Sequence, residues 1–410
     1  MTPDTESTSD SLPTTRGRKL LFGALALVLG VVIGLVIAEA TLRIMGYSSP
    51  QFYETDEVLG YKLIPGLSGW YTKEGRSYVT INSDGFHDVE HALPKPADTV
   101  RIAVVGDSYV EAFQVGRDAA FTNFITSEAR DCGAFDGKNV EVLRFGVSGY
   151  GTAQERLLLR EKVLRYSPDI VMLVMTTNND VTDNLRELKE TPIPYYVLQD
   201  GELVADEGFR GEKGFLARSS AISRLGTWLE NNLRFVQAIR EITRKTKEWY
   251  RRPAAASATD AQASMPATEI GIDSQVYREP SDETWKKAWQ VTEAIVAAMR
   301  SDVQNSGARF MLVTASNGVQ VLPHVEQRAV FAERLGVDDL YYPDRRITQF
   351  GRANGIPVMN LAPYLAEHSA REKVNLHGFE GNVGYGHWNQ LGHRVAGKEL
   401  GKWLCEAARF

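Results

Sequence analysis

The stretch Val100-Arg101-Ile102-Ala103-Val104-Val105-Gly106-Asp107-Ser108 decides the fold. Its apolar, β-branched run predicts a buried strand at 100–105, and the glycine and aspartate that follow are typical of a strand-to-loop turn. Similar runs recur at 140–145, 170–176, 309–314 and 356–361. Because helical periodicity separates these runs, they predict a parallel sheet covered on both faces, which binds ligands at the carboxyl ends of its strands.

The expected fold class is therefore α/β, a flavodoxin-like three-layer sandwich around a parallel five-stranded sheet. The helices between its strands are expected at 121–130, 154–166 and 285–300, with a last helix after 391. More than a hundred residues separate the third strand from the helix at 285–300. That distance is too long for one crossover between parallel strands, so we expect an insertion at about 183–282.

The insertion itself has parts of different character. Asp200-Gly201 lies between apolar residues and predicts a β-hairpin over 195–204. Residues 216–250 predict a helix that becomes basic toward its end, which fits either a solvated charged face or contact with anionic lipid. Residues 253–275, in which Ala, Ser, Thr and Pro are frequent, predict a flexible segment.

Composition excludes several classes of protein. The 410 residues are 43% hydrophobic and 24% charged, which is ordinary for a globular chain and excludes a disordered or collagen-like one. A net charge of -6 gives no reason to expect a nucleic-acid partner. Two cysteines, Cys132 and Cys405, are too few for a structural zinc site, but they can form one disulfide in an oxidising compartment.

The N-terminus indicates the compartment. A polar tail at 1–19 ends in basic residues, and an uncharged apolar run follows at 20–38. At about 1.5 Å per residue, this run just crosses a hydrocarbon core of about 30 Å. The basic residues before it predict a cytoplasmic tail, a single-pass anchor in the cytoplasmic membrane and export of the remainder. A cleaved signal peptide is the alternative, because Ala38-Glu39-Ala40 has the spacing of a cleavage site.

Residues 41–98 form a segment rich in Gly, Pro and Tyr between the anchor and the first strand of the sheet. It has too few apolar residues for a core of its own, so we expect a stem that packs on the domain at 99–410. Within the stem, residues 78–81 predict a strand and Asp84-Gly85 a turn.

Four motifs carry the chemistry. Ser108 follows the first strand, the glycine-rich loop 145–151 with Gly149 follows the second, and Asn179 follows the third, whereas His387 precedes the last helix. A glycine lets a backbone N–H approach a substrate oxygen, an asparagine amide can donate to an oxyanion, and a histidine can act as a general base. Each motif taken alone also fits an ordinary turn or a structural role.

In this order the motifs resemble those of the SGNH (GDSL) hydrolase superfamily over roughly 99–410, apart from the insertion. The resemblance implies Ser108 as nucleophile and His387 as its base, with an oxyanion hole from the N–H groups of Ser108 and Gly149 and the Asn179 side chain. It requires no metal or cofactor. Residues 81–86 and the anchor look like a membrane-anchored bacterial envelope subgroup of that superfamily. Asp107 and Asp180 are expected to brace the loops around the site.

The chain departs from the family pattern at two places. Thr177 stands where the third motif has a glycine. The aspartate expected two or three residues before His387 is absent, because residues 384–386 are Gly, Tyr and Gly. In a serine protease triad, losing the acid's hydrogen bond costs about 10⁴ in turnover. Three explanations stay open: a backbone carbonyl orients His387, an acid such as Glu380 does so, or the enzyme is degenerate.

The leading hypothesis is an exported serine esterase that removes a small acyl group, such as acetyl, from an envelope carbohydrate or lipid. Its expected partners are that acylated substrate, the membrane through 20–38 and the machinery of envelope polysaccharides. Transfer of the acyl group to a polysaccharide hydroxyl is an alternative that uses the same residues. A third hypothesis is a carbohydrate-binding or assembly protein that kept the fold without catalysis.

Overall fold

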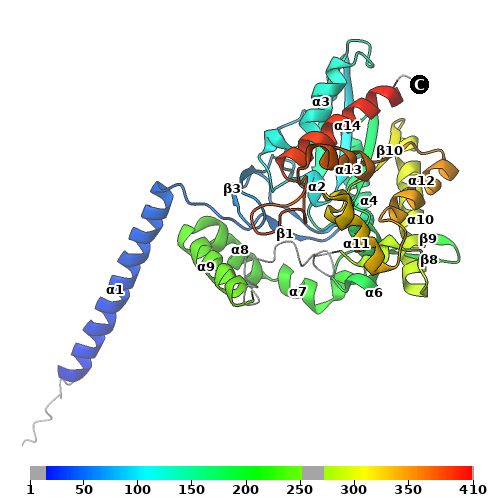
Figure 1. Ribbon diagram of the computed structural model, residues 1–410. Helices are drawn as coiled ribbons and strands as arrows, with labels where there is room; N and C mark the ends of the chain where they lie inside the picture. The colour runs from blue at the N-terminus through cyan, green and yellow to red at the C-terminus, as the bar shows by residue number, and fades with distance from the viewer. Residues whose placement is uncertain (1–14, 252–271, 409–410) are drawn as a thin grey trace, which may run out of the picture. The chain divides into compact units, whose positions relative to one another are not determined.

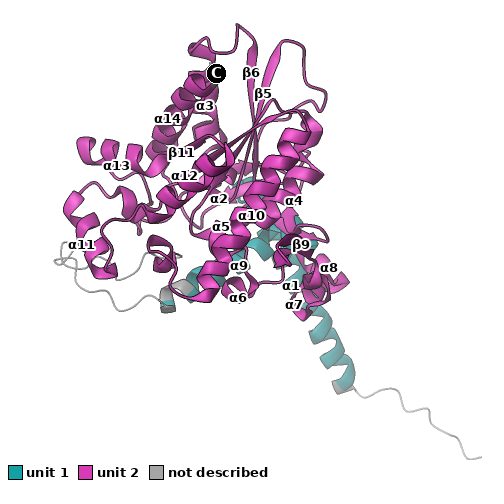
Figure 2. Ribbon diagram, turned by 90° about the vertical axis from the view of Figure 1, so that its right-hand side faces the viewer, with its two compact units in different colours: residues 1–49, 228–251 teal, residues 50–227, 252–410 magenta. Residues whose placement is uncertain are grey.

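The computed structural model describes residues 15–251 and 272–408. The chain divides into two compact units, residues 1–49 with 228–251 and residues 50–227 with 252–410 (Figure 2). Most of the segment expected to be flexible lies outside the described residues. Its last part is described, and there Ser274–Tyr277 forms the short 3₁₀ helix η5.

The larger unit is built on a five-stranded sheet with the strand order β11-β10-β7-β5-β6. Its strands are β5 (Thr99–Gly106), β6 (Asn139–Gly146), β7 (Ile170–Met175), β10 (Arg309–Thr314) and β11 (Val358–Asn360). All neighbouring strands run parallel. With the strands renumbered along the chain, the order is 5-4-3-1-2, which is the flavodoxin-like arrangement. The predicted α/β class and its parallel sheet are therefore confirmed.

Each strand contributes to two cores because successive side chains point to opposite faces of the sheet. Ile102 and Val104 of β5 belong to one core, whereas Ala103 and Val105 belong to the other. The first core includes α3 (Phe121–Asp131), α13 (Leu361–Glu372) and α14 (Gln390–Ala408). The second includes α4 (Thr152–Glu161), α10 (Glu283–Asn305) and α12 (Tyr342–Asn354). The two groups of helices cover opposite faces and complete the three layers (Figure 1).

A disulfide joins two helices of the same layer. Cys132 directly follows α3 and is bonded to Cys405 of α14, with their Cα atoms 6.2 Å apart. The bond links positions 273 residues apart. It therefore closes a loop that contains most of the sandwich.

The insertion follows β7, as the sequence indicates. Its hairpin pairs β8 (Tyr195–Gln199) with β9 (Glu202–Asp206). Asp200 and Gly201 have φ values of 50° and 85°, as a two-residue type I′ turn requires. The hairpin predicted from Asp-Gly is confirmed. The short helix α5 (Asn179–Thr182) lies between β7 and the insertion. The insertion also contains α6 (Arg186–Lys189), η3 (Gly208–Gly211), α7 (Lys213–Ser219), α8 (Ala221–Asn232) and α9 (Arg234–Arg251).

Short elements complete the larger unit. They are α2 (Ser108–Glu111), η1 (Arg117–Ala119), η2 (Val163–Tyr166), η6 (Gly318–Val321) and α11 (Val325–Leu335). The first of these matters most for the site, because α2 begins two residues after β5 ends.

The stem consists of two antiparallel hairpins. β1 (Tyr53–Asp56) pairs with β2 (Gly60–Leu63), and β3 (Ser68–Tyr71) pairs with β4 (Ser77–Thr80). Phe52, Leu63 and Val79 of the stem pack in one cluster with Phe113, which lies just beyond α2. The stem therefore completes its small apolar cluster with a residue of the sandwich.

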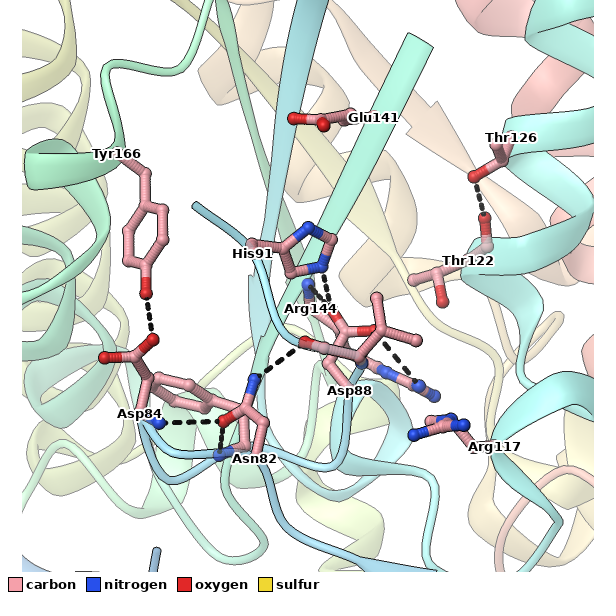
Figure 3. A network of polar contacts seen from close by, with 12 residues as sticks. Asn82, Asp84, Asp88, His91, Arg117, Thr122, Thr126, Glu141, Arg144 and Tyr166 are labelled. Carbon is pink, nitrogen blue, oxygen red and sulfur yellow. Dashed lines mark hydrogen bonds and ion pairs between the residues drawn. The ribbon is translucent and has the colours of Figure 1, made fainter. Parts of the chain in front are cut away.

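Polar contacts fix the end of the stem to the sheet (Figure 3). Asp88 accepts a hydrogen bond of 2.8 Å from the backbone N–H of Arg144 in β6, and it also faces the Arg144 guanidinium at 3.6 Å. His91 lies 3.1 Å from the same carboxylate. Because the Arg144 side chain is only 1% exposed, its charge needs a partner of opposite sign. The stem supplies that partner.

The smaller unit contains α1 (Thr15–Ile44) and α9. The segment Gly17–Ile44 is long and apolar enough to cross a membrane, with a hydropathy of 3.0 in its most apolar window. None of that window is buried. A signal sequence near the N-terminus is also compatible with this length and composition.

Candidate active site

Ser108 lies at the first position of α2, directly beyond the carboxyl end of β5. Asp107 caps this helix, because its Oδ1 accepts a hydrogen bond of 3.0 Å from the backbone N–H of Tyr109. Ser108 is only 3% exposed. The predicted turn after the first strand thus presents a serine hydroxyl in a largely buried position.

The two ring nitrogens of His387 contact two different partners. Nε2 lies 2.7 Å from Ser108 Oγ, and Nδ1 lies 2.5 Å from Glu74 Oε2. An ionised carboxylate can only accept a hydrogen bond, so Nδ1 carries the hydrogen. Nε2 of the neutral ring is then able to accept the hydroxyl hydrogen of Ser108. Ser108, His387 and Glu74 form a hydrogen-bonded chain suited to nucleophilic catalysis.

Glu74 comes from the turn between β3 and β4 of the stem. Its second oxygen, Oε1, accepts hydrogen bonds from the backbone N–H of His387 at 3.0 Å and from Asn382 Nδ2 at 3.2 Å. Burial alone raises the pKa of the Glu74 carboxyl, but the hydrogen bonds and charge of His387 and the amide of Asn382 lower it below the usual value. Glu74 is therefore ionised at neutral pH, as its role toward Nδ1 requires.

Glu74 takes the place for which the sequence suggested Glu380 or a backbone carbonyl. Glu380 is exposed, and among the described residues the group that hydrogen-bonds to Nδ1 of His387 is Glu74. Gly386, which directly precedes His387, makes room for this contact. It has a φ of 76°, and a Cβ at this position would lie 2.3 Å from Glu74 Oε1. The glycine leaves the space that the stem carboxylate fills.

Sequence reasoning missed Glu74 because no spacing connects it to His387, which lies 313 residues later. The local signal is the pair Glu74-Gly75 at a hairpin turn. Gly75 has a φ of 69°, and a Cβ there would lie 2.4 Å from the carbonyl oxygen of Gln114. The turn must therefore lie close against the chain that follows α2, which brings Glu74 to the site.

The three expected oxyanion donors follow β5, β6 and β7. No acceptor among the described residues bonds the backbone N–H of Ser108 or Gly149. Asn179 Nδ2 donates one hydrogen bond, of 3.0 Å, to Asp107 Oδ2. Because Asp107 directly precedes Ser108, this bond holds the Asn179 amide beside the serine. The second hydrogen of that amide has no acceptor within the described part of the chain.

Asp107 and Asp180 hold the loops that carry these groups. Asp107 Oδ1 also accepts a hydrogen bond of 3.1 Å from Thr176 Oγ1, and Asp180 Oδ2 accepts one of 2.6 Å from the backbone N–H of Thr176. Thr152 Oγ1 donates to Asp180 Oδ1 at 3.1 Å. Both carboxyl groups are fully buried, and burial raises the pKa of each. Asp107 and Asp180 therefore connect the loop after β5 to the loop after β7.

A third buried carboxyl, Glu111 at the end of α2, was not singled out by the sequence. It accepts hydrogen bonds from Tyr53 Oη of the stem at 2.8 Å and from the backbone N–H of Ser148 at 3.0 Å. Tyr61 Oη, also from the stem, donates to the Ser148 carbonyl at 2.9 Å. Burial raises the pKa of Glu111 to about 8. Glu111 thus ties the helix of Ser108 to the stem and to the loop of Gly149.

The histidine loop has its own supports. The carbonyl of Gly386 accepts hydrogen bonds from His377 Nδ1 at 2.6 Å and Tyr109 Oη at 3.2 Å. Because a carbonyl only accepts, His377 Nδ1 carries the hydrogen, and its Nε2 accepts from Ser316 Oγ at 2.8 Å. Burial lowers the pKa of His377 to about 4, so this histidine stays neutral. It positions the loop of His387.

A cavity of about 330 Å³ is lined by the stem and the insertion. Tyr53 and Tyr61, which contact Glu111 and Ser148, line it from the stem, and Thr191 and Arg218 line it from the insertion. The volume lies within the range of small-ligand pockets, about 300–1,000 Å³. Within the described residues, no group of three His, Cys, Asp or Glu side chains forms a candidate metal site.

No protein-family model and no curated protein matches this chain. Among solved structures, it is similar to an acetyl xylan esterase, AlAXEase, at 12% identity and a TM-score of 0.37, covering 74% of this chain and 98% of that one. An acetylxylan esterase from Geobacillus stearothermophilus gives 10% identity, a TM-score of 0.35, and coverage of 73% and 91%. A GDSL-like lipase from Bacteroides thetaiotaomicron gives 12%, 0.31, and coverage of 78% and 93%.

The class of protein is defined by what the structure itself contains. It is a three-layer α/β fold with a Ser–His–Glu chain of hydrogen bonds at the end of the sheet's first strand.

Proposed function

We propose that this chain is a serine esterase, anchored in the cytoplasmic membrane and exported, that removes a small acyl group such as acetyl from an envelope carbohydrate or lipid. One observation carries the proposal: Glu74, His387 and Ser108 are hydrogen-bonded in series at 2.5 and 2.7 Å. The hypothesis of a non-catalytic protein depended on a missing acid, and Glu74 removes that reason.

The reaction follows from these contacts. His387 Nε2 takes the proton of Ser108 Oγ as the oxygen attacks the ester carbonyl carbon. The N–H groups of Ser108 and Gly149 and the Asn179 amide bind the oxyanion that forms. His387 then gives the proton to the leaving alcohol oxygen, and the ester C–O bond breaks to leave an acyl group on Ser108.

The second half of the reaction releases the acid. Water attacks the acyl carbon while His387 Nε2 takes its proton, and the carboxylic acid leaves as the proton returns to Ser108 Oγ. Glu74 keeps its negative charge throughout. It stabilises the imidazolium that forms twice in each cycle and holds the hydrogen on Nδ1.

The direct test uses the purified full chain and a chromogenic acetate ester. Ser108→Ala is expected to lower turnover by about 10⁴-fold or more. A fluorophosphonate probe should label the parent protein on Ser108 and leave Ser108→Ala unlabelled. Equal turnover of the two proteins, or failure of the folded parent to react with the probe, would exclude Ser108 as the nucleophile.

Transfer of the acyl group to a polysaccharide hydroxyl is a second candidate, supported by a cavity lined by the stem and the insertion. It offers tyrosine rings and polar side chains, and one of these, Tyr61, also contacts Ser148 in the loop of Gly149. A glycan hydroxyl that reached the acyl group on Ser108 would compete with water for the acyl enzyme. An isotope-labelled acetyl donor with a glycan acceptor separates the two reactions, since label on the sugar supports transfer and label only in free acetate supports hydrolysis.

The anchored, exported location is supported by two features. The apolar run 20–38 of α1 follows basic residues at the start of the same helix, and the disulfide between Cys132 and Cys405 is of a kind found mainly in oxidising compartments. Intact mass of the membrane-extracted protein tests the anchor. A chain that begins at Met1 or the next residue supports it, whereas one that begins after Ala40 identifies a cleaved signal peptide.

A further inference from the structure

The polar face of α9 is turned inward within the smaller unit. Gln237 is fully buried, and its Oε1 accepts hydrogen bonds from the backbone N–H of Ser49 at 2.8 Å and from Arg234 at 3.1 Å. Arg240 donates to the Ser49 carbonyl at 2.7 Å, and Arg234 donates to Ser48 Oγ at 2.7 Å. The buried side of this helix is therefore held by polar contacts to the segment that follows α1.

The outward face of α9 is apolar, which is the reverse of a helix on a soluble protein. Ile239, Ile242 and Tyr250 are 60%, 65% and 76% exposed. Their spacing places them on one side of the helix. A helix that hides its polar side chains and displays its apolar ones needs a nonpolar phase on its outer side.

The hydroxyl groups on that outward face are already satisfied inside the helix. Thr243 Oγ1 donates to the carbonyl of Ile239, and Thr246 Oγ1 donates to the carbonyl of Ile242, each at 2.8 Å. Both threonines are exposed, so the face presents their methyl groups together with the isoleucines. Such hydrogen bonds remove the cost of placing a hydroxyl in a nonpolar medium.

Two hydrogen bonds fix the position of α9 along α1. Glu39 Oε2 accepts a hydrogen bond of 3.1 Å from the backbone N–H of Phe235, and Arg43 donates one of 2.6 Å to the carbonyl of Asn232. Glu39 is the first charged residue after the apolar run at 20–38. The start of α9 therefore lies where α1 would leave the hydrocarbon and enter the headgroup region.

The charge of α9 suits an anionic lipid surface. The helix has six basic residues against two acidic ones. Lys245 and Lys247 are exposed, so their ammonium groups can reach toward headgroups while the aliphatic parts of their side chains stay along the apolar face. Basic residues beside an apolar face are typical of helices that lie in a membrane surface.

We propose that α9 is a second membrane contact of this protein: it lies in the interface of the same bilayer that α1 spans, with Ile239, Ile242 and Tyr250 in the lipid and Lys245 and Lys247 at anionic headgroups. The inference rests on the anchoring of α1 proposed above. It does not depend on the esterase reaction. A membrane contact of this kind adds a lipid-binding surface to the chain in addition to its anchor.

Fluorophores placed at single positions test this arrangement in the full chain. The native cysteines are bonded to each other, so Ile242→Cys, Leu27→Cys and Thr5→Cys each provide one free thiol for an environment-sensitive dye. The labelled chains are inserted into vesicles of phosphatidylcholine and phosphatidylglycerol that contain nitroxide lipids. Thr5 lies in the polar tail and is the aqueous control.

Dye on Ile242 is expected to lose about half of its fluorescence to a nitroxide near the glycerol, because an interfacial helix lies about 5–10 Å deep. Dye on Leu27 should be quenched by a nitroxide in the middle of the acyl chain, and dye on Thr5 by neither. Quenching at Leu27 without quenching at Ile242 would overturn the proposal while the anchor stands. No quenching at Leu27 would overturn both. The dye on Ile242 could instead report shielding from water that depends on the protein-to-lipid ratio, with no quenching by the nitroxide lipids. That result would mean that this face contacts a second copy of the chain.

A charge reversal tests the lipid class. Quenching at Ile242 should be stronger in vesicles with phosphatidylglycerol than in phosphatidylcholine alone, and Lys245→Glu with Lys247→Glu should abolish that difference. Lys286→Glu with Lys287→Glu on α10 makes the same change in net charge and should leave the difference intact. If the first pair retains the full response to phosphatidylglycerol, the assignment of an anionic surface is wrong.

Discussion

The sandwich supplies Ser108 and His387 from loops at the end of its sheet, whereas the stem supplies Glu74 from the turn of a two-stranded hairpin. Ser108 is fixed by the strand before it and by a buried network below it. Glu74 is fixed by a glycine turn that fits against the chain beyond α2. One proposed chemical unit is thus assembled from a deeply packed region and from a small one that has no core of its own.

The largest effect should come from the stem. Glu74→Gln leaves the shape of the side chain but removes the charge that stabilises the imidazolium and fixes its tautomer. Turnover of a chromogenic acetate ester is expected to fall by about 10³–10⁴-fold, with little change in KM. Glu380→Gln is the matched control on the sandwich and should stay within about twofold of the parent. Comparable losses in both variants would refute the assignment of the acid to Glu74.

A smaller loss is expected from the oxyanion side of the sandwich. Asn179→Ala removes a proposed donor and should lower kcat by about 10²–10³-fold. The same change removes a hydrogen bond to Asp107, so Thr176→Val serves as a control, because it removes another bond to Asp107 and no oxyanion donor. We expect Thr176→Val to lose less than about tenfold. If the two variants lose equal activity, Asn179 acts by bracing Asp107 alone.

The placement of Glu74 can be disturbed without changing Glu74. Gly75→Ala puts a Cβ 2.4 Å from the Gln114 carbonyl oxygen and 2.9 Å from the Phe379 ring. The turn must then shift, and a displacement of about 1 Å in a catalytic group can cost up to about 10²-fold in turnover. Gly66→Ala provides the control, since its φ of 71° is similar and its Cβ would meet nothing within 4 Å. Steady-state assays and thermal unfolding of both variants separate a misplaced Glu74 from a destabilised fold. Gly66→Ala should lower the unfolding temperature through backbone strain without a loss of turnover.

The smallest effect on turnover, and a clear one on stability, is expected at Glu111, where the two regions meet. The carboxyl ionises near pH 4.5 in the unfolded chain and near pH 8 in the fold, because burial raises its pKa. Between these values the folded state binds the extra proton, so Glu111 makes the free energy of unfolding fall as pH rises from about 4.5 to about 8.

Glu111→Gln cannot titrate and keeps acceptors for Tyr53 and Ser148. Urea unfolding at several pH values should show the parent losing stability relative to this variant across that window, by an amount on the order of a few kcal/mol. A difference between the two proteins that stays constant from pH 5 to pH 8 would mean that Glu111 is already ionised in the fold.

The same contrast explains what could be predicted from the sequence. The strands of the sheet are buried on both faces, so their apolar runs stand out, and the polar residues that follow them fall at one edge by the geometry of parallel strands. Ser108, Gly149 and Asn179 were predicted as site residues for that reason. The hairpin at Asp200-Gly201 was found because its turn type restricts the residues that can form it.

Glu74 and Glu111 could not be found in this way. Glu74 reaches His387 through tertiary packing of a half-buried hairpin, whose strands have only four residues each. Glu111 lies in a single turn of helix, where a charged residue is ordinarily exposed. Its burial depends on tertiary hydrogen bonds from Tyr53 of the stem and from the backbone N–H of Ser148. The stem was recognised as a packing segment, but its contribution to chemistry depends on contacts that no local pattern encodes.

The position of Glu74 also decides what must be kept together when this protein is cut, fused or recombined. A chain that begins at Thr99 would retain the serine, the oxyanion donors, the histidine and the disulfide, and so every motif by which the sequence resembles a hydrolase. It would nevertheless lack the carboxylate that accepts from His387 Nδ1. The shortest segment of the chain that could carry the proposed activity therefore starts within the stem. Substitutions in the turn of its second hairpin are expected to coevolve with the loop around Gly386 and His387.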